Sequence, residues 1–316
     1  MNNVKYSKWI DKQNKTIADV QEKINASSSY RRNHIERDEF DGNPLLFKAD
    51  FAFDQEKTIT LKGTKYKYNF VNFSYETINV PKKDSDDRSQ RVKINNLKVV
   101  VVEIDNGIVY LVNKPDTQST LTSMRKLHNL STNNKIAVSN ISGIKSDLFV
   151  WLVHNLIDEP EKNIGSNSDI IVSSLTAFRG EKPTEDESEK LNKINGSGET
   201  IMKMVTTLLF LLESKSVSSV ELQVKPQKSN LDIKLTRGGG VELDLNSFTH
   251  PPVSQKGEWE QYSEKLIFIF FYLIPEIINS FSDEQLHRKW TPSKMKKFYR
   301  AIGVDIKRRI NEIVKQ

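Results

Sequence analysis

KVVVVEIDNGIVYLVNK, residues 98–114, carries the clearest structural signal in this chain. Two runs rich in β-branched residues flank Asp105-Asn106-Gly107, and Asn-Gly between such runs is the strongest short mark of a β-hairpin. The four consecutive valines, Val99 to Val102, indicate a strand that is buried on both faces. We therefore predict a hairpin in the middle of a sheet.

The segments on either side of this hairpin alternate irregularly between strand and helix patterns. Residues 45–80 repeat apolar side chains with a period of two, as at Tyr66, Tyr68 and Phe70, which predicts strands. The further predicted elements are a helix over 121–130, a strand over 136–141, a helix over 147–157, a strand over 169–178, a helix over 201–212, and strands over 220–224, 231–236 and 241–245. Because no βαβ unit repeats, we predict an α+β fold with a central, mainly antiparallel sheet, packed helices and a basic, helical C-terminal segment.

Four regions are expected along the chain. The first, residues 1–30, is an N-terminal amphipathic helix. Residues 45–160 form a first α+β region, residues 168–250 form a second, and residues 256–316 form a helical segment that is basic from residue 286. The apolar stripe of the N-terminal helix consists of Tyr6, Trp9, Ile10, Ile17, Val20 and Ile24.

Composition excludes several classes of site. The chain of 316 residues contains no cysteine, which excludes disulfides, thiolate catalysis and Cys-based zinc or iron–sulfur sites. Its five histidines are scattered without metal-ligand spacing, so we expect neither a metal nor a cofactor. Charged residues near the N-terminus replace the apolar run of a signal peptide, and the absence of cysteine fits a reducing compartment, so a cytoplasmic location is expected.

Residues 266–274, LIFIFFYLI, are the one candidate for a membrane segment. Pro275 and Glu276 follow directly, and the whole apolar stretch is shorter than the roughly 20 residues that a spanning helix needs. A helix that is apolar on all sides is also typical of a large core, and we predict that interpretation here.

The C-terminal segment accounts for the sign of the protein's charge. Residues 286–316 contain ten Lys/Arg and two acids, a net +8, in a chain whose net charge is +6, so residues 1–285 carry a net −2. Ser282 with Gln285 suggests a capping box, Thr291-Pro292 suggests a helix start, and Gly303 suggests a stop, which predicts two or three short helices. Such helices, with Trp290, Phe298 and Tyr299 among the cations, could bind a phosphate backbone; a solvated helical face would give the same pattern.

Two further patterns could carry chemistry. Gly196-Ser197-Gly198 precedes a predicted helix but lacks the Lys-Ser/Thr of a P-loop, so it is a weak nucleotide signal. Glu221 on one predicted strand and Asp232-Ile233-Lys234 on the next could hold Mg²⁺ and orient a water for phosphodiester hydrolysis, the geometry that restriction-type nucleases use. The same alternation also places Asp232 and Lys234 together on an ordinary solvated face.

Several segments, collinear along the chain, resemble the RexA phage-exclusion proteins of temperate phages. The resemblance covers residues of about 95–250 and includes no functional motif, so it transfers no catalytic residue. The similar segments are Gly107–Lys114 with the helix containing Leu121 and Lys126-Leu127, Ser146-Asp147-Leu148 before a helix, Arg179-Gly180 before an acidic stretch, and Val220–Lys228 with Asp232-Ile233-Lys234.

This resemblance implies a cytoplasmic protein of an anti-phage exclusion (abortive infection) system. Such a protein would bind double-stranded DNA with little sequence preference as a homodimer, sense phage DNA or DNA–protein complexes, and signal to a small membrane partner of the RexB type. The expected DNA-binding residues are Arg125, Lys126, Arg179, Lys225 and Lys228 in the similar region, and Arg288, Lys289, Lys296, Lys297, Arg300, Arg308 and Arg309 in the basic segment.

Three hypotheses therefore stand. The first is a non-enzymatic DNA sensor. The second is a Mg²⁺-dependent nuclease of a defence system, built on Glu221, Asp232 and Lys234. The third is an interaction scaffold whose basic end meets an acidic protein or an anionic lipid.

Overall fold

The computed structural model has the predicted α+β architecture, with antiparallel sheet and packed helices, and its described residues form two compact units. The N-terminal unit comprises Lys5–Ser139 and Gln255–Ile267. The C-terminal unit comprises Met1–Val4, Asn140–Ser254 and Phe268–Gln316. The described residues are 3–105, 107–129, 135–160, 162–164, 170–181, 194–195, 216–226, 229–248 and 256–315. The predicted helix over 201–212 and the Gly196-Ser197-Gly198 sequence lie outside them.

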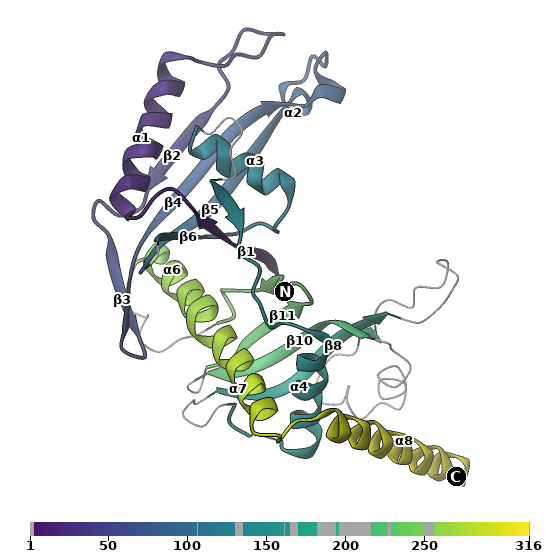
Figure 1. Ribbon diagram of the computed structural model, residues 1–316. Helices are drawn as coiled ribbons and strands as arrows, with labels where there is room; N and C mark the ends of the chain where they lie inside the picture. Colours follow the sequence, from purple (N-terminus) through teal and green to yellow (C-terminus); the bar gives the residue numbers. More distant parts are fainter. Residues whose placement is uncertain are drawn as a thin grey trace. The chain divides into compact units, whose positions relative to one another are not determined.

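An antiparallel sheet in the order β2-β4-β5-β6-β1 forms the centre of the N-terminal unit, with β3 paired to β4 and β7 paired to β1 (Figure 1). The predicted hairpin is confirmed, because β5 and β6 pair outward from Ile104 and Gly107. Val99–Val102 are fully buried, as expected of a strand with a neighbour on each side. The strands are β1 (Val4–Asp11), β2 (Phe47–Phe51), β3 (Lys57–Leu61), β4 (Thr64–Ile78), β5 (Val92–Ile104), β6 (Gly107–Val112) and β7 (Ile136–Val138).

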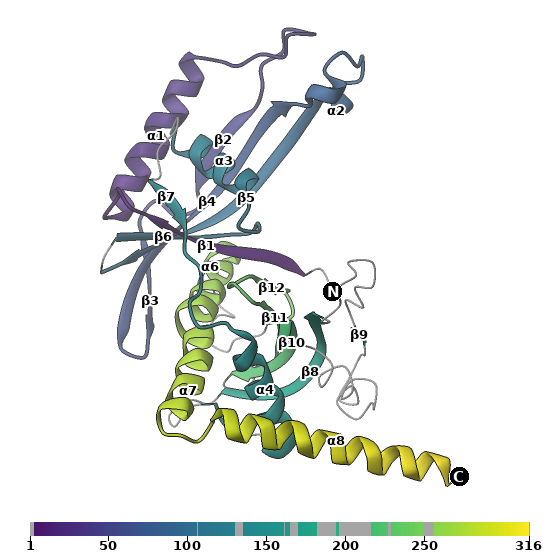
Figure 2. The ribbon, with the colours of Figure 1, turned by 45° about the vertical axis from the view of Figure 1, so that its right-hand side comes forward.

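Helices cover both faces of this sheet. The helices α1 (Ile17–Asn33) and α3 (Gln118–Leu127) share one apolar core with alternate residues of β4, β5 and β6, and Figures 1 and 2 show both helices on the same face. On the other face lies α6 (Glu258–Phe268), whose Trp259 ring stacks on Phe70 with centroids 4.6 Å apart. The Tyr68 hydroxyl donates to Glu264 Oε1 over 2.8 Å, and burial together with this carboxylate raises the pKa of Tyr68.

The predicted helix over residues 1–30 is wrong in its first half. Val4–Asp11 form β1, which pairs with β6, and the helix begins only at Ile17. The capping box at Thr16 and Asp19 sets that start: the Thr16 hydroxyl accepts from the Asp19 N–H, and the Asp19 carboxylate accepts from the Thr16 N–H. Pairing with a distant strand thus overrides the local apolar spacing, because it supplies hydrogen bonds to β1 and buries Trp9.

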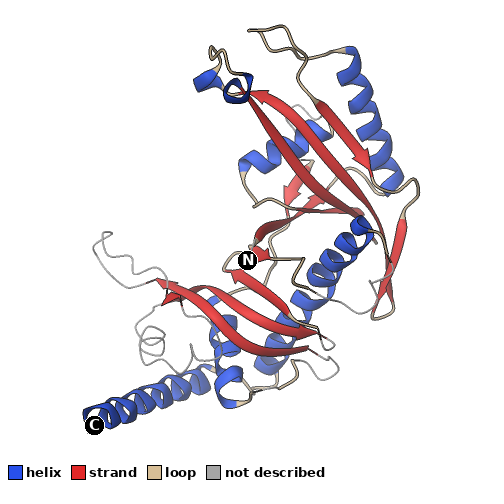
Figure 3. Cartoon of the chain, turned by 180° about the vertical axis from the view of Figure 1, so that it is seen from behind, coloured by secondary structure: helices blue, strands red, loops and turns tan. Residues whose placement is uncertain are grey.

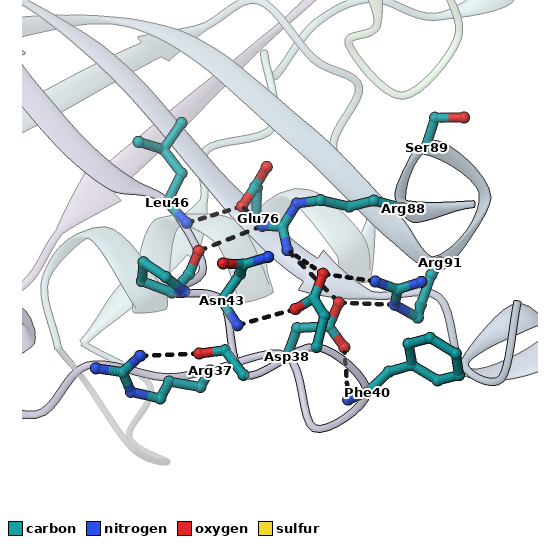
Figure 4. Close-up of polar contacts among 12 residues, drawn as sticks. Arg37, Asp38, Phe40, Asn43, Leu46, Glu76, Arg88, Ser89 and Arg91 are labelled. Atoms are coloured by element: carbon teal, nitrogen blue, oxygen red, sulfur yellow. Dashed lines mark hydrogen bonds and ion pairs between the residues drawn. The ribbon is translucent and has the colours of Figure 1, made fainter. Parts of the chain in front are cut away.

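A cluster of charged side chains connects two loops of the N-terminal unit (Figure 4). Arg91, at the end of α2 (Arg88–Arg91), donates from Nε to Asp38 Oδ2 and from Nη2 to Asp41 Oδ2, each over 2.7 Å. Arg88 lies between Asp38, Asp41 and Glu76, and donates to the Glu76 carboxylate over 3.0 Å. A short 3₁₀ turn, η1 (Val80–Lys82), precedes α2. The cluster fixes the segment after α1 against the turn between β4 and β5.

A second antiparallel sheet, drawn in red in Figure 3, forms the centre of the C-terminal unit. Its strands pair in the order β12-β11-β10-β8-β9. The helix α4 (Ser146–Asp158) packs on β8 and β10, so it belongs to this unit rather than to the predicted region 45–160. The β10–β12 meander confirms the three strands that were predicted over 220–245. The strands are β8 (Ile170–Glu181), β9 (Ile194–Asn195), β10 (Ser216–Pro226), β11 (Leu231–Thr236) and β12 (Val241–Leu243).

The apolar stretch 266–274 lies at the end of α6, in a π-helical turn, η4 (Ile269–Leu273), and at the start of α7 (Ile274–Leu286). Proline at position 275 has no N–H to donate to the carbonyl four residues back, which explains a local departure from α-helical bonding. Among the described residues, Glu258–Leu286 is the one stretch of helix long and apolar enough to cross a membrane, and 56% of its most apolar window is buried. Seven of the nine residues 266–274 are buried, which fits the predicted core position.

The basic C-terminal segment forms one 23-residue helix, α8 (Pro292–Val314), and not two or three short ones. The predicted start at Thr291 is confirmed, since its hydroxyl accepts from the Lys294 N–H. The predicted stop at Gly303 is wrong, because the apolar residues before and after this glycine pack and offset its modest helical cost of about 1 kcal/mol. The predicted capping box at Ser282 is also wrong: Ser282 lies inside α7 and donates to the Ile278 carbonyl.

Candidate functional site

One side of α8 anchors the helix to the C-terminal unit. Phe298, Ile302 and Ile306 recur every four residues and are buried. The His154 ring on α4 lies 5.1 Å from the Phe298 ring and 4.7 Å from the ring of Trp290, the residue before the N-cap of α8. This packing holds the first four turns of α8 in a fixed orientation.

The connection from α7 to α8 is fixed by polar contacts as well. Trp151 of α4 donates from Nε1 to Glu284 Oε2 over 2.8 Å, and Lys162 Nζ lies 3.0 Å from the other carboxylate oxygen of Glu284. The Trp290 N–H donates to the Glu284 carbonyl over 3.0 Å. The end of α7 is therefore tied to α4 immediately before α8 begins.

The aromatic residues of the basic segment face the protein interior. Trp290 and Phe298 are buried in the contact with α4. Tyr299 is half-buried, and burial together with the charge of Asp147 raises the pKa of its hydroxyl. These rings stabilise the fold and do not lie with the cations on an accessible surface, so the aromatic contribution to phosphate binding that the sequence predicted is not supported.

Cations lie along the opposite side of α8, four before Gly303 and three after it, with the exposed Val304 between the two groups. At roughly 100° per residue, seven cations lie off the Phe298–Ile302–Ile306 stripe, and Glu312 is the acid that accompanies them. All seven are exposed, and within the described ranges Arg308 is the one of them that forms an ion pair. We call this surface the basic face of α8; it consists of Lys294, Lys296, Lys297, Arg300, Lys307, Arg308 and Lys315.

Two arginines of α8 are engaged by acids of the same helix. Arg308 contacts Asp305 and Glu312 at 2.7 and 2.6 Å, and Arg309 contacts Asp305 at 2.7 Å. The hydrogen bond from Arg308 lowers the pKa of Asp305. Arg309 lies toward the packed side of the helix and is partly buried, so it is the α8 member of the predicted DNA-binding set that lies off the basic face.

The other predicted DNA-binding residues lie apart from the basic face. Arg288 and Lys289 are exposed in the connection between α7 and α8. Arg179 and Lys225 are exposed on β8 and β10, where they pair in register with Ser219 and Ile171. Since these register positions are eight residues apart along β8, Arg179 and Lys225 stand about 26 Å from each other and cannot form one patch. Lys228 lies outside the described residues.

Arg125 and Lys126 belong to α3 of the N-terminal unit. Lys126 Nζ lies 3.2 Å from Glu36 Oε2 and 5.0 Å from the centre of the Tyr75 ring. Its charge is therefore already paired. Arg125 is half-buried. Both contribute less to an accessible positive surface than the sequence suggested.

The residues of the nuclease hypothesis do come together on neighbouring strands. Glu221 pairs in register with Lys234, and Gln223 pairs with Asp232. Lys234 Nζ lies 3.8 Å from Glu221 Oε1 and 3.0 Å from Glu242 Oε2 on β12. Asp232 accepts a hydrogen bond from Gln223 Nε2 over 3.3 Å. Cross-strand charge pairing accounts for this arrangement.

A metal-binding group is not evident in that arrangement. In the described part of the chain, no three His, Cys, Asp or Glu side chains are grouped so that they could hold a metal ion. Lys234 lies between the two nearest carboxylates and neutralises part of their charge. The geometry can thus orient a lysine between two acids, but the described residues offer Mg²⁺ no cluster of carboxylates.

Three residues of the basic face were absent from the predicted set: Lys294, Lys307 and Lys315. Helical spacing in the sequence could have identified them. Lys307, for example, follows Arg300 after two helical turns and so lies on the same side of one continuous helix. The predicted break at Gly303 concealed this spacing.

No family model matches the chain, and no curated protein matches it.

Proposed function

We propose that this protein binds double-stranded DNA, with little sequence preference, through phosphate contacts along the basic face of α8. The observation that carries the proposal is the seven exposed cations on one side of a helix whose other side is anchored. A helix of 23 residues is about 34 Å long, close to one turn of duplex DNA. Flexible lysines spaced along that length can each contact a phosphate.

The composition of this face supports sequence tolerance. Lysine and arginine contacts to phosphates fix position but read no bases. Trp290 and Phe298, which could have stacked on bases, are buried against α4. Binding would then depend on charge and on the regular spacing of phosphates, so affinity should fall steeply with salt.

The resemblance to RexA proteins extends this proposal to a biological role. It supports a DNA-sensing component of an anti-phage exclusion system that acts as a homodimer in the cytoplasm and signals to a small membrane protein of the RexB type. The similar region, residues of about 95–250, does not include α8, so the DNA surface rests on charge and geometry alone. Co-purification of a membrane protein encoded beside this one, in a phage-dependent manner, would test the role.

Charge reversal on the basic face tests the DNA-binding proposal. The variant replaces Lys296, Lys297, Arg300 and Lys307 with Glu, all exposed and without an ion pair among the described residues. We expect affinity for several unrelated duplexes to fall by about a hundredfold or more. The slope of log K against log salt should become shallower by about 0.9 for each phosphate that the variant no longer neutralises.

The matched control reverses four exposed lysines elsewhere, Lys12, Lys15, Lys82 and Lys83, and changes net charge by the same amount. Its affinity should stay within a few-fold of the wild type. An equal loss in both variants would mean that net charge alone governs binding and would refute a dedicated surface. Retained affinity in the α8 variant would refute it as well.

A further inference from the structure

The last turns of α8 carry an apolar edge that no described part of the chain covers. Ile310 is 46% exposed, Ile313 is 66% exposed and Val314 is 78% exposed. They continue the stripe of Phe298, Ile302 and Ile306 at the same helical spacing, beyond the point where α4 covers it. Figures 1 and 2 show the C-terminal half of α8 extending past α4. The apolar stripe of α8 is therefore buried in its first part and exposed to solvent in its last turns.

Cations border this apolar edge. Lys307 lies beside Val314 on one side, and Arg309 lies on the other, while exposed Lys315 follows at the end of the helix. Asp305 and Glu312 are already engaged by Arg308 and Arg309. The edge therefore combines three aliphatic side chains with a positively charged border, and its complement is a surface that is apolar inside and anionic at its rim.

We infer that this edge inserts into the interfacial layer of an anionic lipid bilayer. An amphipathic helix with aliphatic residues on one side and Lys/Arg around them lies in the membrane interface, held by apolar burial and by attraction to anionic headgroups. The long stems of Lys307 and Lys315 can follow the apolar surface while their ammonium groups reach lipid phosphates. Each cation near such a surface adds to the attraction.

The size of the edge favours a bilayer over a protein partner. Three aliphatic side chains on the convex end of one helix bury on the order of 400 Å², whereas a stable protein interface needs about 800 Å² on each partner. A bilayer closes around a single helix and requires no groove. A second copy of the chain would offer only another edge of the same small area.

This inference goes beyond the proposed DNA binding and does not depend on it. Ile313 and Lys297 point in directions roughly 160° apart around the helix, so the middle of the apolar edge and the centre of the basic face are separate, while Lys307 and Lys315 lie on the border that the two share. Replacing Ile310, Ile313 and Val314 keeps all seven cations of the basic face. Substitution of the apolar edge should therefore leave DNA affinity unchanged.

Vesicle flotation of the full chain tests the inference. Wild-type protein should float with vesicles that contain phosphatidylglycerol and should not float with pure phosphatidylcholine. The variant with Ile310, Ile313 and Val314 replaced by Gln should lose flotation by about tenfold or more, because it keeps the charges but lacks the apolar anchor. The control variant replaces three exposed apolar residues of the N-terminal unit, Ile35, Val80 and Ile94, with Gln and should float like the wild type.

Three results would overturn the inference. Flotation that survives in the α8 variant would assign lipid binding to charge alone. Wild-type protein that fails to float with anionic vesicles would remove the membrane as occupant. A dimer, seen by light scattering, that the α8 variant loses while neither protein floats would assign the edge to a second copy of the chain.

Discussion

Arg91 and Asp38 lie 53 residues apart in sequence, yet Arg91 Nε donates to Asp38 Oδ2 over 2.7 Å and each residue is only 1% exposed. Removing one member of a buried ion pair leaves the other charge without a partner and costs about 3–5 kcal/mol. We therefore expect Arg91→Met to lower the free energy of unfolding by that amount in urea denaturation. Arg88→Gln, in the same cluster but with a side chain 34% exposed, should cost clearly less. Equal losses would show that burial does not set the energy of this cluster.

A second prediction concerns the buried His128. Burial lowers the pKa of its imidazole from 6.5 to about 4; the nearby Asp11 raises this pKa and Lys23 lowers it. Neither ring nitrogen has a hydrogen-bond partner in the described residues, and Asp11 already accepts bonds from Gln13, Asn14 and Tyr110. The protonated ring therefore has no acceptor ready for it.

The lowered pKa of His128 determines how the free energy of unfolding changes with pH. The unfolded chain binds a proton at His128 below about pH 6.5, whereas the folded chain does so only near pH 4, so stability is full above 6.5 and falls between 6.5 and 4. The loss amounts to roughly 3 kcal/mol by pH 4. Thermal unfolding across that range should show a smaller pH dependence in His128→Gln than in the wild type. An unchanged profile would contradict the assignment to His128.

A third prediction separates charge pairing from catalysis on β10 and β11. Lys234→Met leaves Glu221 and Glu242 without the cation between them, and we expect a loss of about 0.5–1 kcal/mol in unfolding free energy. Wild-type protein should not cleave duplex DNA with Mg²⁺ or Mn²⁺. Cleavage that disappears in Asp232→Ala would contradict this expectation and would revive the nuclease hypothesis.

A fourth prediction concerns the anchor of α8. Phe298→Ala removes a buried ring that contacts His154, at a cost of about 3 kcal/mol in the packing of α8. Faster cleavage by trypsin within α8 would report that loss. The control Ile310→Ala, at an exposed position of the same helix, should change stability by about 0.5 kcal/mol or less. Equal protection of α8 in both variants would show that Phe298 does not anchor the helix.

The parts of this fold that the sequence predicted correctly depend on neighbours along the chain. The β5–β6 hairpin needs only the Asn-Gly turn and the two apolar runs beside it, so Val99 to Val102 could be placed in the middle of a sheet. The β10–β12 meander is local in the same way. In each case the residues that decide the structure lie within a few positions of one another.

The errors arise where a distant partner decides. Trp9 has helical spacing to its neighbours, but its strand pairs with Tyr110, about a hundred residues later, and no local pattern reports that pairing. Lys126 looked available for DNA, but Glu36 lies against it from 90 residues earlier. The predicted basic face of α8 is incomplete because a glycine such as Gly303 usually ends a helix. Packing of Ile302 and Ile306 keeps the helix intact through that glycine.

The helix α6 of the N-terminal unit lies more than a hundred residues after the rest of that unit in the sequence. During synthesis, the sheet of this unit is therefore made well before the helix that covers one of its faces. Residues 5–139 leave the ribosome with Phe70 and Val100 on an uncovered face of their sheet, because α6, which stacks Trp259 on Phe70, follows more than a hundred residues later. A nascent chain with such a bare apolar face is prone to aggregate. Until residues 255–267 emerge, this apolar face can associate with other nascent chains. A low concentration of such chains, or a bound chaperone, would prevent that association.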